Sequence, residues 1–263
     1  MNLAGKIALI TAGAGGIGLS IAKRFAECGA ELCLCDISAQ ALSEAQAQLP
    51  DALVVQADVS DSAQIRQLFE TFGKRFDHLD VLVNNAGISG PTKPVEQITD
   101  EEWAATMSVN LSGMFYMARA AIPLFRAAQG GCIINMSSVA GRVGMPLRLP
   151  YSVSKFAIRG LTETLAIELG EMGVRVNSLL PGLVDGPRGQ RVIAEQAAAR
   201  GVSVEEYTRM FLHNISMHSM VQMQEIADMA AFLASDLAPH VSGQSIGVCG
   251  NFESYRAPLV MAG

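Results

Sequence analysis

Short apolar runs alternate with longer stretches of helical periodicity over the first 180 residues, and this alternation leaves the chain few folds. The apolar runs predict six β-strands, at residues 7–10, 31–35, 53–56, 81–83, 132–135 and 174–179. Helices are predicted between them, at residues 17–28, 39–49, 63–76, 101–126 and 151–170. Strands joined through helices of this length are typical of βαβ crossovers and a parallel sheet. Because the strands are apolar almost throughout, we expect helices on both faces of that sheet.

The remainder of the chain is less regular. A seventh strand is expected near 245–249, and the tail 251–263 shows no clear element. Residues 182–223 are the least regular, with helical stretches at 191–200 and 204–213. Long insertions of this kind are often lids or binding segments, so we expect a substrate-binding insertion at about 183–220. The 263 residues contain no linker or repeat, which predicts one α/β domain (1–263) with a Rossmann-type doubly wound parallel sheet of about seven strands.

Composition excludes several classes of protein. The chain carries 19 Lys and Arg against 25 Asp and Glu, a net charge of −6, whereas a nucleic-acid binder needs clustered positive charge. No run approaches the roughly 18–20 apolar residues of a membrane-spanning helix. Glycines interrupt the apolar stretch 7–22, which also lacks a signal-peptide cleavage site. We therefore expect a soluble, cytoplasmic protein with neither nucleic-acid nor membrane partners.

The five cysteines are odd in number and irregularly spaced, which predicts no disulfide framework. Cys33 and Cys35 are expected on the same face of a strand, where thiols pack as small apolar groups. The four histidines show no metal-ligand spacing. Buried, reduced thiols and no metal site are the expectation.

The first predicted strand leads into a glycine-rich turn. Gly13, Gly15 and Gly18 satisfy the pattern G-x-G-x-x-G directly before a predicted helix. Glycine is needed in such a turn because a pyrophosphate must approach the backbone N–H groups at the helix N-terminus without interference from Cβ atoms. The pattern alone can arise by chance in a chain with 25 glycines. Its position between a strand and a helix favours a dinucleotide site.

Asp36 ends the second predicted strand, 18 residues after Gly18. A carboxylate at this point can accept hydrogen bonds from both ribose hydroxyls of adenosine and repels a 2′-phosphate. Ile37 and Ser38 follow, so no adjacent cation favours that phosphate. The sequence predicts NAD rather than NADP as the cofactor. The alternative, that Asp36 only caps the next helix, is weakened because Ser38 is better placed for that role.

Tyr151 and Lys155 lie one helical turn apart, on the same face of a predicted helix. A phenol with a pKa of about 10 is a poor base at neutral pH, but a neighbouring ammonium group lowers that pKa. The pair can then exchange a proton with an alcohol or carbonyl oxygen, and Ser138, after the fifth strand, can polarise the same oxygen. Taken alone, each feature has a simpler interpretation: serines often cap helices, and Tyr–Lys pairs occur by chance.

Together these residues carry a family resemblance. From residue 6 to residue 250 the chain resembles the short-chain dehydrogenase/reductase family. The motifs are 11–18, Asp58-Val59, 84–87, Asn110, Ser138, Tyr151 thirteen positions later, Lys155, and Pro181-Gly182. The resemblance implies a seven-stranded parallel sheet, usually in a homotetramer. It also implies that Ser138, Tyr151 and Lys155 act together in catalysis and that Asn110 holds a water molecule that relays protons.

Cofactor contacts are implied by the same resemblance. Asp58 and Val59 would hold the adenine, residues 84–87 would line the cofactor and stabilise the central sheet, and Lys155 would also bond the nicotinamide ribose. The full predicted cofactor set is Gly13, Gly16, Ile17, Gly18, Asp36, Asp58, Val59, Asn85, Ala86, Gly87, Tyr151, Lys155, Pro181, Gly182 and Val184.

Three positions depart from the family pattern. Ala12 follows the motif threonine, where the family usually has glycine. Gly186 stands where many members place a threonine that contacts the nicotinamide carboxamide. Near the C-terminus, Val-Cys-Gly-Asn (248–251) replaces the usual Val-Asp-Gly-Gly. None of the three removes a group needed for proton or hydride transfer.

Two arginines are candidates for substrate binding. Arg148 lies three residues before Tyr151, and Arg188 lies in the insertion. Guanidinium groups bind carboxylates, phosphates and sulfonates in a bidentate manner; the simpler alternative is that both are solvated loop residues. We therefore predict an NAD-dependent alcohol dehydrogenase that acts on a small, polar secondary alcohol, anionic if the arginines bind it. The alternatives are an NADH-dependent carbonyl or 3-oxoacyl reductase and, less favoured, a non-catalytic NAD-sensing protein.

Overall fold

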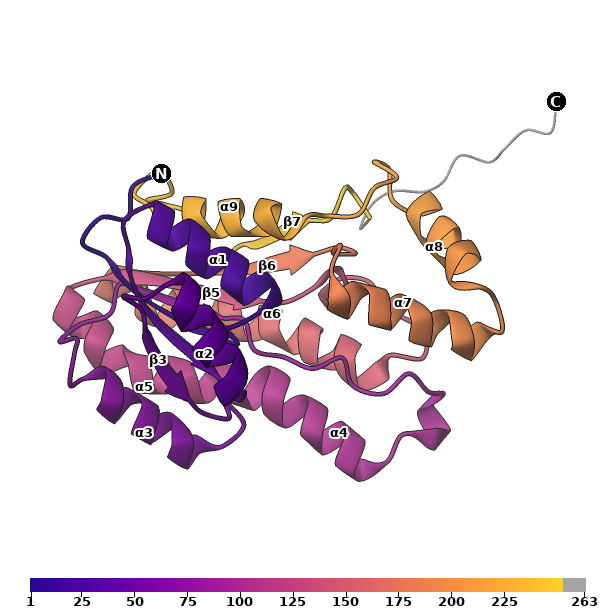
Figure 1. Ribbon diagram of the computed structural model, residues 1–263, viewed down its shortest axis with the longest axis horizontal. Helices are drawn as coiled ribbons and strands as arrows, with labels where there is room; N and C mark the ends of the chain where they lie inside the picture. Colours follow the sequence, from indigo (N-terminus) through magenta and orange to yellow (C-terminus); the bar gives the residue numbers. More distant parts are fainter. Residues whose placement is uncertain (253–263) are drawn as a thin grey trace.

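Seven parallel strands form one sheet at the centre of the computed structural model, which describes residues 1–252 (Figure 1). The strands are β1 (Ile7–Thr11), β2 (Glu31–Asp36), β3 (Leu53–Gln56), β4 (Val81–Asn84), β5 (Gly131–Met136), β6 (Val174–Pro181) and β7 (Ser245–Val248). Their order in the sheet is β3-β2-β1-β4-β5-β6-β7. The order reverses between β1 and β4, and doubly wound sheets bind their ligands beyond the carboxyl ends of the strands at such a point. The predicted fold class is confirmed.

Helices cover both faces of the sheet. They are α1 (Gly16–Glu27), α2 (Ala39–Gln48), α3 (Ser62–Phe72), α4 (Asp100–Met107), α5 (Gly113–Ala128), α6 (Leu149–Leu169), α7 (Pro187–Arg200), α8 (Val204–His213) and α9 (Met223–Ala234). Along β1, Ala8 and Ile10 contribute to a core with α1, α2 and α9, whereas Ile7 and Leu9 contribute to a second core with α3 and α5. This alternation follows from the two-residue period of a strand. Because both faces are covered, the strands are apolar almost throughout.

Local sequence explains where several helices begin. The Ser38 side chain accepts a hydrogen bond from the Ala41 N–H and caps α2, as expected. Asp61 caps α3 in the same way. At α4, Thr99 and Glu102 form a reciprocal capping box. These caps place α2, α3 and α4 directly after loops at the carboxyl edge of the sheet.

Two features differ from the predicted elements. The predicted helix 101–126 is interrupted: α4 ends at Met107, a π-helical turn occupies Ser108–Ser112, and α5 follows. Helix α9 was not predicted, although Gln222 and Glu225 form a capping box at its start. Most other predicted ends differ from the observed ones by a few residues, and α7 begins at Pro187, four residues before its predicted start. Residues 253–263 of the predicted tail lie outside the described residues.

All five cysteines are buried free thiols, as predicted. Cys33 and Cys35 both belong to the core that α3 and α5 cover, so they share one face of β2. Burial raises the pKa of Cys35 to about 12 and that of Cys132 to about 11. The thiolate form, which is the reactive one, is therefore suppressed at neutral pH. Within residues 1–252 no helix is both long enough and apolar enough to cross a membrane.

Candidate active site

The turn between β1 and α1 is packed so closely that glycine is required at its last motif position. A Cβ at Gly18 would lie 2.1 Å from the carbonyl oxygen of Ala12 and 2.7 Å from Nδ2 of Asn85. At Gly15, by contrast, a Cβ would meet nothing within 4 Å. Helix α1 also starts without a side-chain cap or an acidic residue in its first turn. The start of α1 is therefore open to an anionic group on its N–H side.

Thr11 joins this turn to the segment after β4. Its Oγ1 accepts hydrogen bonds from the N–H groups of Asn85 (2.9 Å) and Ala86 (3.0 Å). In return, Nδ2 of Asn85 donates to the carbonyl oxygens of Thr11 and Ala12, both at 3.1 Å. The next residue, Gly87, reaches the polar cluster on α6, because a Cβ there would lie 3.6 Å from Nζ of Lys155. The predicted residues Asn85, Ala86 and Gly87 thus bridge the two halves of the site.

Asp36 lies at the carboxyl end of β2, beside the glycine-rich turn. Its Oδ2 accepts a hydrogen bond from the Ala14 N–H (3.4 Å), and its Oδ1 accepts one from the Ser38 N–H (3.1 Å). The neighbouring Ile37 is 64% exposed and brings no charge. An open helix start with a carboxylate beside it suits the pyrophosphate and the adenosine ribose of a dinucleotide. The residues present therefore fit such a cofactor.

The other predicted cofactor residues lie at the same edge and have structural contacts of their own. Oδ1 of Asp58 accepts hydrogen bonds from the N–H (2.8 Å) and the hydroxyl (2.7 Å) of Ser60. Val59 packs against Gly113, where a Cβ would lie 3.0 Å from Cγ2 of Val59. After Pro181, the N–H of Gly182 donates to the Val248 carbonyl (2.9 Å). Val184 pairs with Val221 in an isolated bridge, and Gly16 and Ile17 open α1.

Helix α6 presents Tyr151 and Lys155 to the end of β5. Nζ of Lys155 lies 5.6 Å from the centroid of the Tyr151 ring and donates a hydrogen bond to the Met136 carbonyl (2.7 Å). Burial opposes ionisation of Tyr151, but the charges of Lys155, Arg188 and Arg148 and a hydrogen bond with Ser138 bring the net pKa of the phenol below its ordinary value. Burial lowers the pKa of Lys155 to about 8. The cluster can therefore exchange protons near neutral pH.

Ser138 follows β5 and faces this cluster. Its Oγ accepts a hydrogen bond from the Ala140 N–H (3.2 Å), so it also caps the short 3-10 turn Val139–Gly141. The preceding Ser137 donates from Oγ to the Lys155 carbonyl (2.8 Å). A Cβ at Gly141 would lie 2.5 Å from that same carbonyl oxygen. The end of β5 and α6 are thus in close contact, which sets the position of Ser138 relative to Tyr151.

Asn110 is fully buried in the π-helical turn between α4 and α5. Its Oδ1 accepts from the Ile88 N–H (2.7 Å), while its Nδ2 donates to the Ile88 carbonyl (3.0 Å) and to Oγ of Ser154 (3.0 Å). The Ser154 hydroxyl in turn donates to the Tyr151 carbonyl (2.7 Å). Asn110 therefore ties the loop after β4 to α6. Sequence reasoning missed Ser154, although its place between Tyr151 and Lys155 was a usable signal.

Both predicted arginines lie close to Tyr151. Arg148, at the start of α6, is only 7% exposed, and its Cζ lies 4.5 Å from the Tyr151 ring centroid. Its Nη2 donates to the Ser89 carbonyl (3.0 Å). Arg188 of α7 is exposed and donates from Nη1 to the Gly87 carbonyl (3.1 Å). The solvated-loop interpretation is therefore wrong for Arg148, although it describes the exposure of Arg188.

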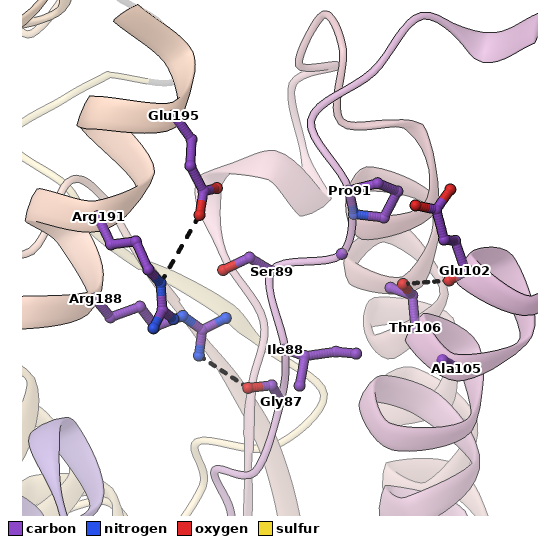
Figure 2. A pocket seen from close by; sticks show the side chains of 11 residues that line it. Gly87, Ile88, Ser89, Pro91, Glu102, Ala105, Thr106, Arg188, Arg191 and Glu195 are labelled. Carbon is purple, nitrogen blue, oxygen red and sulfur yellow. Dashed lines mark hydrogen bonds and ion pairs between the residues drawn. The ribbon is translucent and has the colours of Figure 1, made fainter. Parts of the chain in front are cut away.

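A cavity of about 460 Å³ lies between the loop after β4 and helix α7 (Figure 2). Its walls are Gly87, Ile88, Ser89, Gly90 and Pro91 from the loop, Glu102, Ala105 and Thr106 from α4, and Arg188, Arg191 and Glu195 from α7. Figure 2 shows the α7 and α4 side chains on opposite sides of the loop. Sequence reasoning did not single out Ser89 or Glu195. Helix α7 belongs to the predicted insertion 183–220, and it forms one wall of this cavity.

Comparisons with known proteins agree with this geometry. A family described as enoyl-(acyl carrier protein) reductase matches residues 12–252. Galactitol 2-dehydrogenase of Agrobacterium fabrum is 37% identical over 252 residues, which are 95% of this chain and 98% of the relative.

Two solved structures are similar over nearly their whole length. One is NAD⁺-bound xylitol dehydrogenase, with a TM-score of 0.91 and 29% identity over 95% of this chain and 100% of the other. The second is a variant of actinorhodin polyketide ketoreductase with NADPH, with a TM-score of 0.91 and 30% identity over 95% of this chain and 98% of the other. With its parallel sheet, its glycine-rich turn and the Ser138, Tyr151 and Lys155 cluster, the chain belongs to the short-chain dehydrogenase/reductase family.

Proposed function

We propose that this protein is an NAD-dependent dehydrogenase that oxidises a small, polar secondary alcohol to the ketone. The observation that carries the proposal is the buried cluster of Tyr151, Lys155 on the same helix face and Ser138 at the adjacent strand end, whose charge and hydrogen bond lower the pKa of the phenol. Such a phenol is suited to proton transfer with an alcohol oxygen. Relatives that oxidise alcohols and relatives that reduce ketones share this fold.

The chemistry divides among the four predicted catalytic residues. A bound nicotinamide supplies a ring carbon that accepts the hydride. Ser138 donates a hydrogen bond to the alcohol oxygen and orients it, and Tyr151 as the phenolate takes the hydroxyl proton. The charge of Lys155 favours that phenolate. Asn110 holds the loop after β4 against α6, and we assign it the relay water that the family resemblance implies.

NAD is the proposed cofactor, held by the full predicted set from Gly13 to Val184. The carboxylate of Asp36 beside the turn supports this choice, because it would repel a 2′-phosphate and Ile37 offers no compensating cation. Lys155 would bond the nicotinamide ribose as well as tune Tyr151. NAD preference favours the oxidative direction. The second candidate, a carbonyl or 3-oxoacyl reductase, uses the same residues in reverse and is supported by the similarity to the ketoreductase that holds NADPH.

Domain organisation, oligomeric state and cellular location complete the proposal. We propose a single domain, 1–263, in which the insertion 183–220 binds substrate through Arg188, together with Arg148, which donates to the carbonyl of Ser89 in the cavity wall. A homotetramer is supported by Phe115 of α5 and Phe156 of α6, which are 45% and 43% exposed and would be covered by a second copy. A cytoplasmic location is supported by the five free thiols, which suit a reducing compartment.

The experiment that tests this function follows NADH formation by its absorbance, with polyols, hydroxy acids and cyclic alcohols as substrates and with NAD or NADP. We expect turnover with NAD. In Tyr151→Phe we expect kcat to fall by about 10²–10⁴-fold, with NADH binding retained as the control for folding. Full activity in Tyr151→Phe would contradict the mechanism. Reduction of ketones with NADH, without oxidation of any alcohol, would favour the reductase.

A further inference from the structure

Arg148 is a buried cation whose hydrogen-bonding capacity is only partly used. It is 7% exposed, and Nη2 donates to the Ser89 carbonyl. Its Nε is buried without any hydrogen-bond partner. Among residues 1–252 it forms no ion pair with a carboxylate. Burying a guanidinium without an anion is costly, so the protein maintains at this position a group that an anionic ligand would satisfy.

A second unsatisfied group lies next to it. Oγ of Ser89 is buried and has no hydrogen-bond partner. Ser89 lines the cavity of about 460 Å³ while its own carbonyl accepts from Arg148. Its side chain extends towards α7, which carries Arg188 (Figure 2). A hydroxyl donor and a guanidinium donor are therefore available within one small region.

The charges around this region are unbalanced. Burial lowers the pKa of Arg148 and the positive charge of Arg188 lowers it further, and although Tyr151, Glu195 and Tyr207 act in the opposite direction, the net pKa stays below its ordinary value. Lys155 adds a third cation near Tyr151. The acidic side chain on this side of the cavity, Glu195, is paired with Arg191, with 3.9 Å between Oε1 and Nε. An anion that enters between Arg148 and Arg188 therefore relieves repulsion and gains charge-assisted hydrogen bonds.

We propose that the substrate is a 2- or 3-hydroxy acid whose carboxylate binds Arg148, Arg188 and the Ser89 hydroxyl. This inference rests on the proposed function and names its substrate class. Cζ of Arg148 is 4.5 Å from the Tyr151 ring centroid, and this closeness suits a carboxylate that is one or two bonds from the carbinol carbon. The carbinol C–H bond releases its hydride to NAD⁺ and the O–H proton passes to Tyr151, which leaves the corresponding oxo acid.

The experiment compares each acid with its uncharged methyl ester. The substrates are lactate and both enantiomers of 3-hydroxybutyrate, and kcat/KM is measured with NAD. Arg148→Met preserves the apolar contact with the Tyr151 ring but removes the charge. We expect this variant to lose roughly 10- to 100-fold in kcat/KM for the preferred acid and much less for its ester. The ratio of acid to ester cancels any effect of Arg148 on the tyrosine itself.

Matched variants separate a local effect from a general one. Arg66→Gln removes an exposed positive charge on α3 and should leave the ratio unchanged. Ser89→Ala removes the second donor and should lower the ratio by a smaller factor, which keeps the test valid if Arg148→Met folds poorly. An equal loss for acid and ester in Arg148→Met, or a preference of the native protein for the ester, would overturn the proposal.

A binding measurement distinguishes this inference from the proposed function. Calorimetry follows acetoacetate and methyl acetoacetate on the native protein and on Arg148→Met. Selective binding of acetoacetate that is lost in the variant supports the anion site even when no alcohol is oxidised, and in that case it is the dehydrogenase function that fails. Oxidation of xylitol or another neutral alcohol, without selective binding of acetoacetate, would support the dehydrogenase function and overturn the proposal that the substrate is a hydroxy acid.

Discussion

The glycine-rich turn after β1 and the polar cluster around Tyr151 lie at the same edge of the sheet, but the turn offers main-chain groups and the cluster offers side chains. The turn exposes backbone, and a Cβ at Gly18 would be 2.1 Å from a carbonyl oxygen. The cluster depends on ionisable side chains, of which Lys155 is only 3% exposed. Main-chain N–H groups do not titrate, whereas the pKa of a buried ionisable side chain depends on the charges around it. We therefore expect substitutions at the turn to change affinity and stability, and substitutions in the cluster to change rate and pH dependence.

Replacing Lys155 by methionine tests this contrast most strongly. The variant keeps a long buried side chain but removes the charge that favours the Tyr151 phenolate. Oxidation requires the deprotonated tyrosine, so its rate rises as pH increases through the pKa of Tyr151. Without Lys155 that pKa rises, so the profile of kcat/KM should move to higher pH, and activity at neutral pH should fall on the order of 100-fold.

The control for this prediction is Lys23→Met, which removes an exposed lysine on α1 and should leave the profile in place. Because the pKa of Lys155 is about 8, the native protein should itself lose part of the benefit of this charge above that pH. A Lys155→Met profile with an unchanged midpoint would show that the tyrosine does not depend on the charge.

Cofactor choice tests the turn side of the comparison. Asp36→Ala combined with Ile37→Arg removes the carboxylate and adds a cation where Ile37 is 64% exposed. We expect the ratio of NADPH to NADH affinity to rise roughly 10- to 100-fold, measured by the fluorescence of the bound cofactors. Ile37→Arg alone is the matched control and should give a smaller change. An unchanged pH profile in the double variant would sharpen the contrast with Lys155.

The smallest expected effect concerns Ala12. Its φ is +47°, a left-handed conformation that costs an alanine about 1–2 kcal/mol. Ala12→Gly removes this strain at some cost in chain entropy and should raise the free energy of unfolding by about 1 kcal/mol in urea titrations. Gly18→Ala is the opposite case, because its Cβ would collide with the Ala12 carbonyl, and it should be destabilising. No gain in Ala12→Gly would mean that the surrounding contacts already favour the left-handed turn.

Periodicity predicted the regular parts of this fold well. Strand 53–56 and helix 204–213 coincide with β3 and α8, because a short apolar run predicts a strand and apolar residues at a helical period predict a helix. The glycine-rich turn and Asp36 were located in a different way, from the spacing of the glycines and the 18 residues that separate Gly18 from Asp36. The missed helix α9 carried a signal in Gln222 and Glu225, but its irregular surroundings obscured it.

Contacts between distant segments were beyond the reach of sequence patterns. No periodicity predicts that Arg188 donates to the Gly87 carbonyl or that Asn110 holds Ile88 through both groups of its amide. The burial of Arg148 was missed because an arginine in a loop is usually solvated. Its nearness to Tyr151 was predictable from their spacing, but the unsatisfied Nε required the structure.

The π-helical turn Ser108–Ser112 makes the protein sensitive to insertions and deletions between α4 and α5. An α-helix advances by about 100° per residue, so deleting one residue from the turn would make α4 and α5 continuous but would rotate α4 by about that angle. Glu102, which lines the cavity and forms an ion pair with Lys93, would then turn away from its partner. The irregular turn therefore sets the phase between two helices, and length changes there are expected to be far less tolerated than substitutions on the exposed faces of either helix.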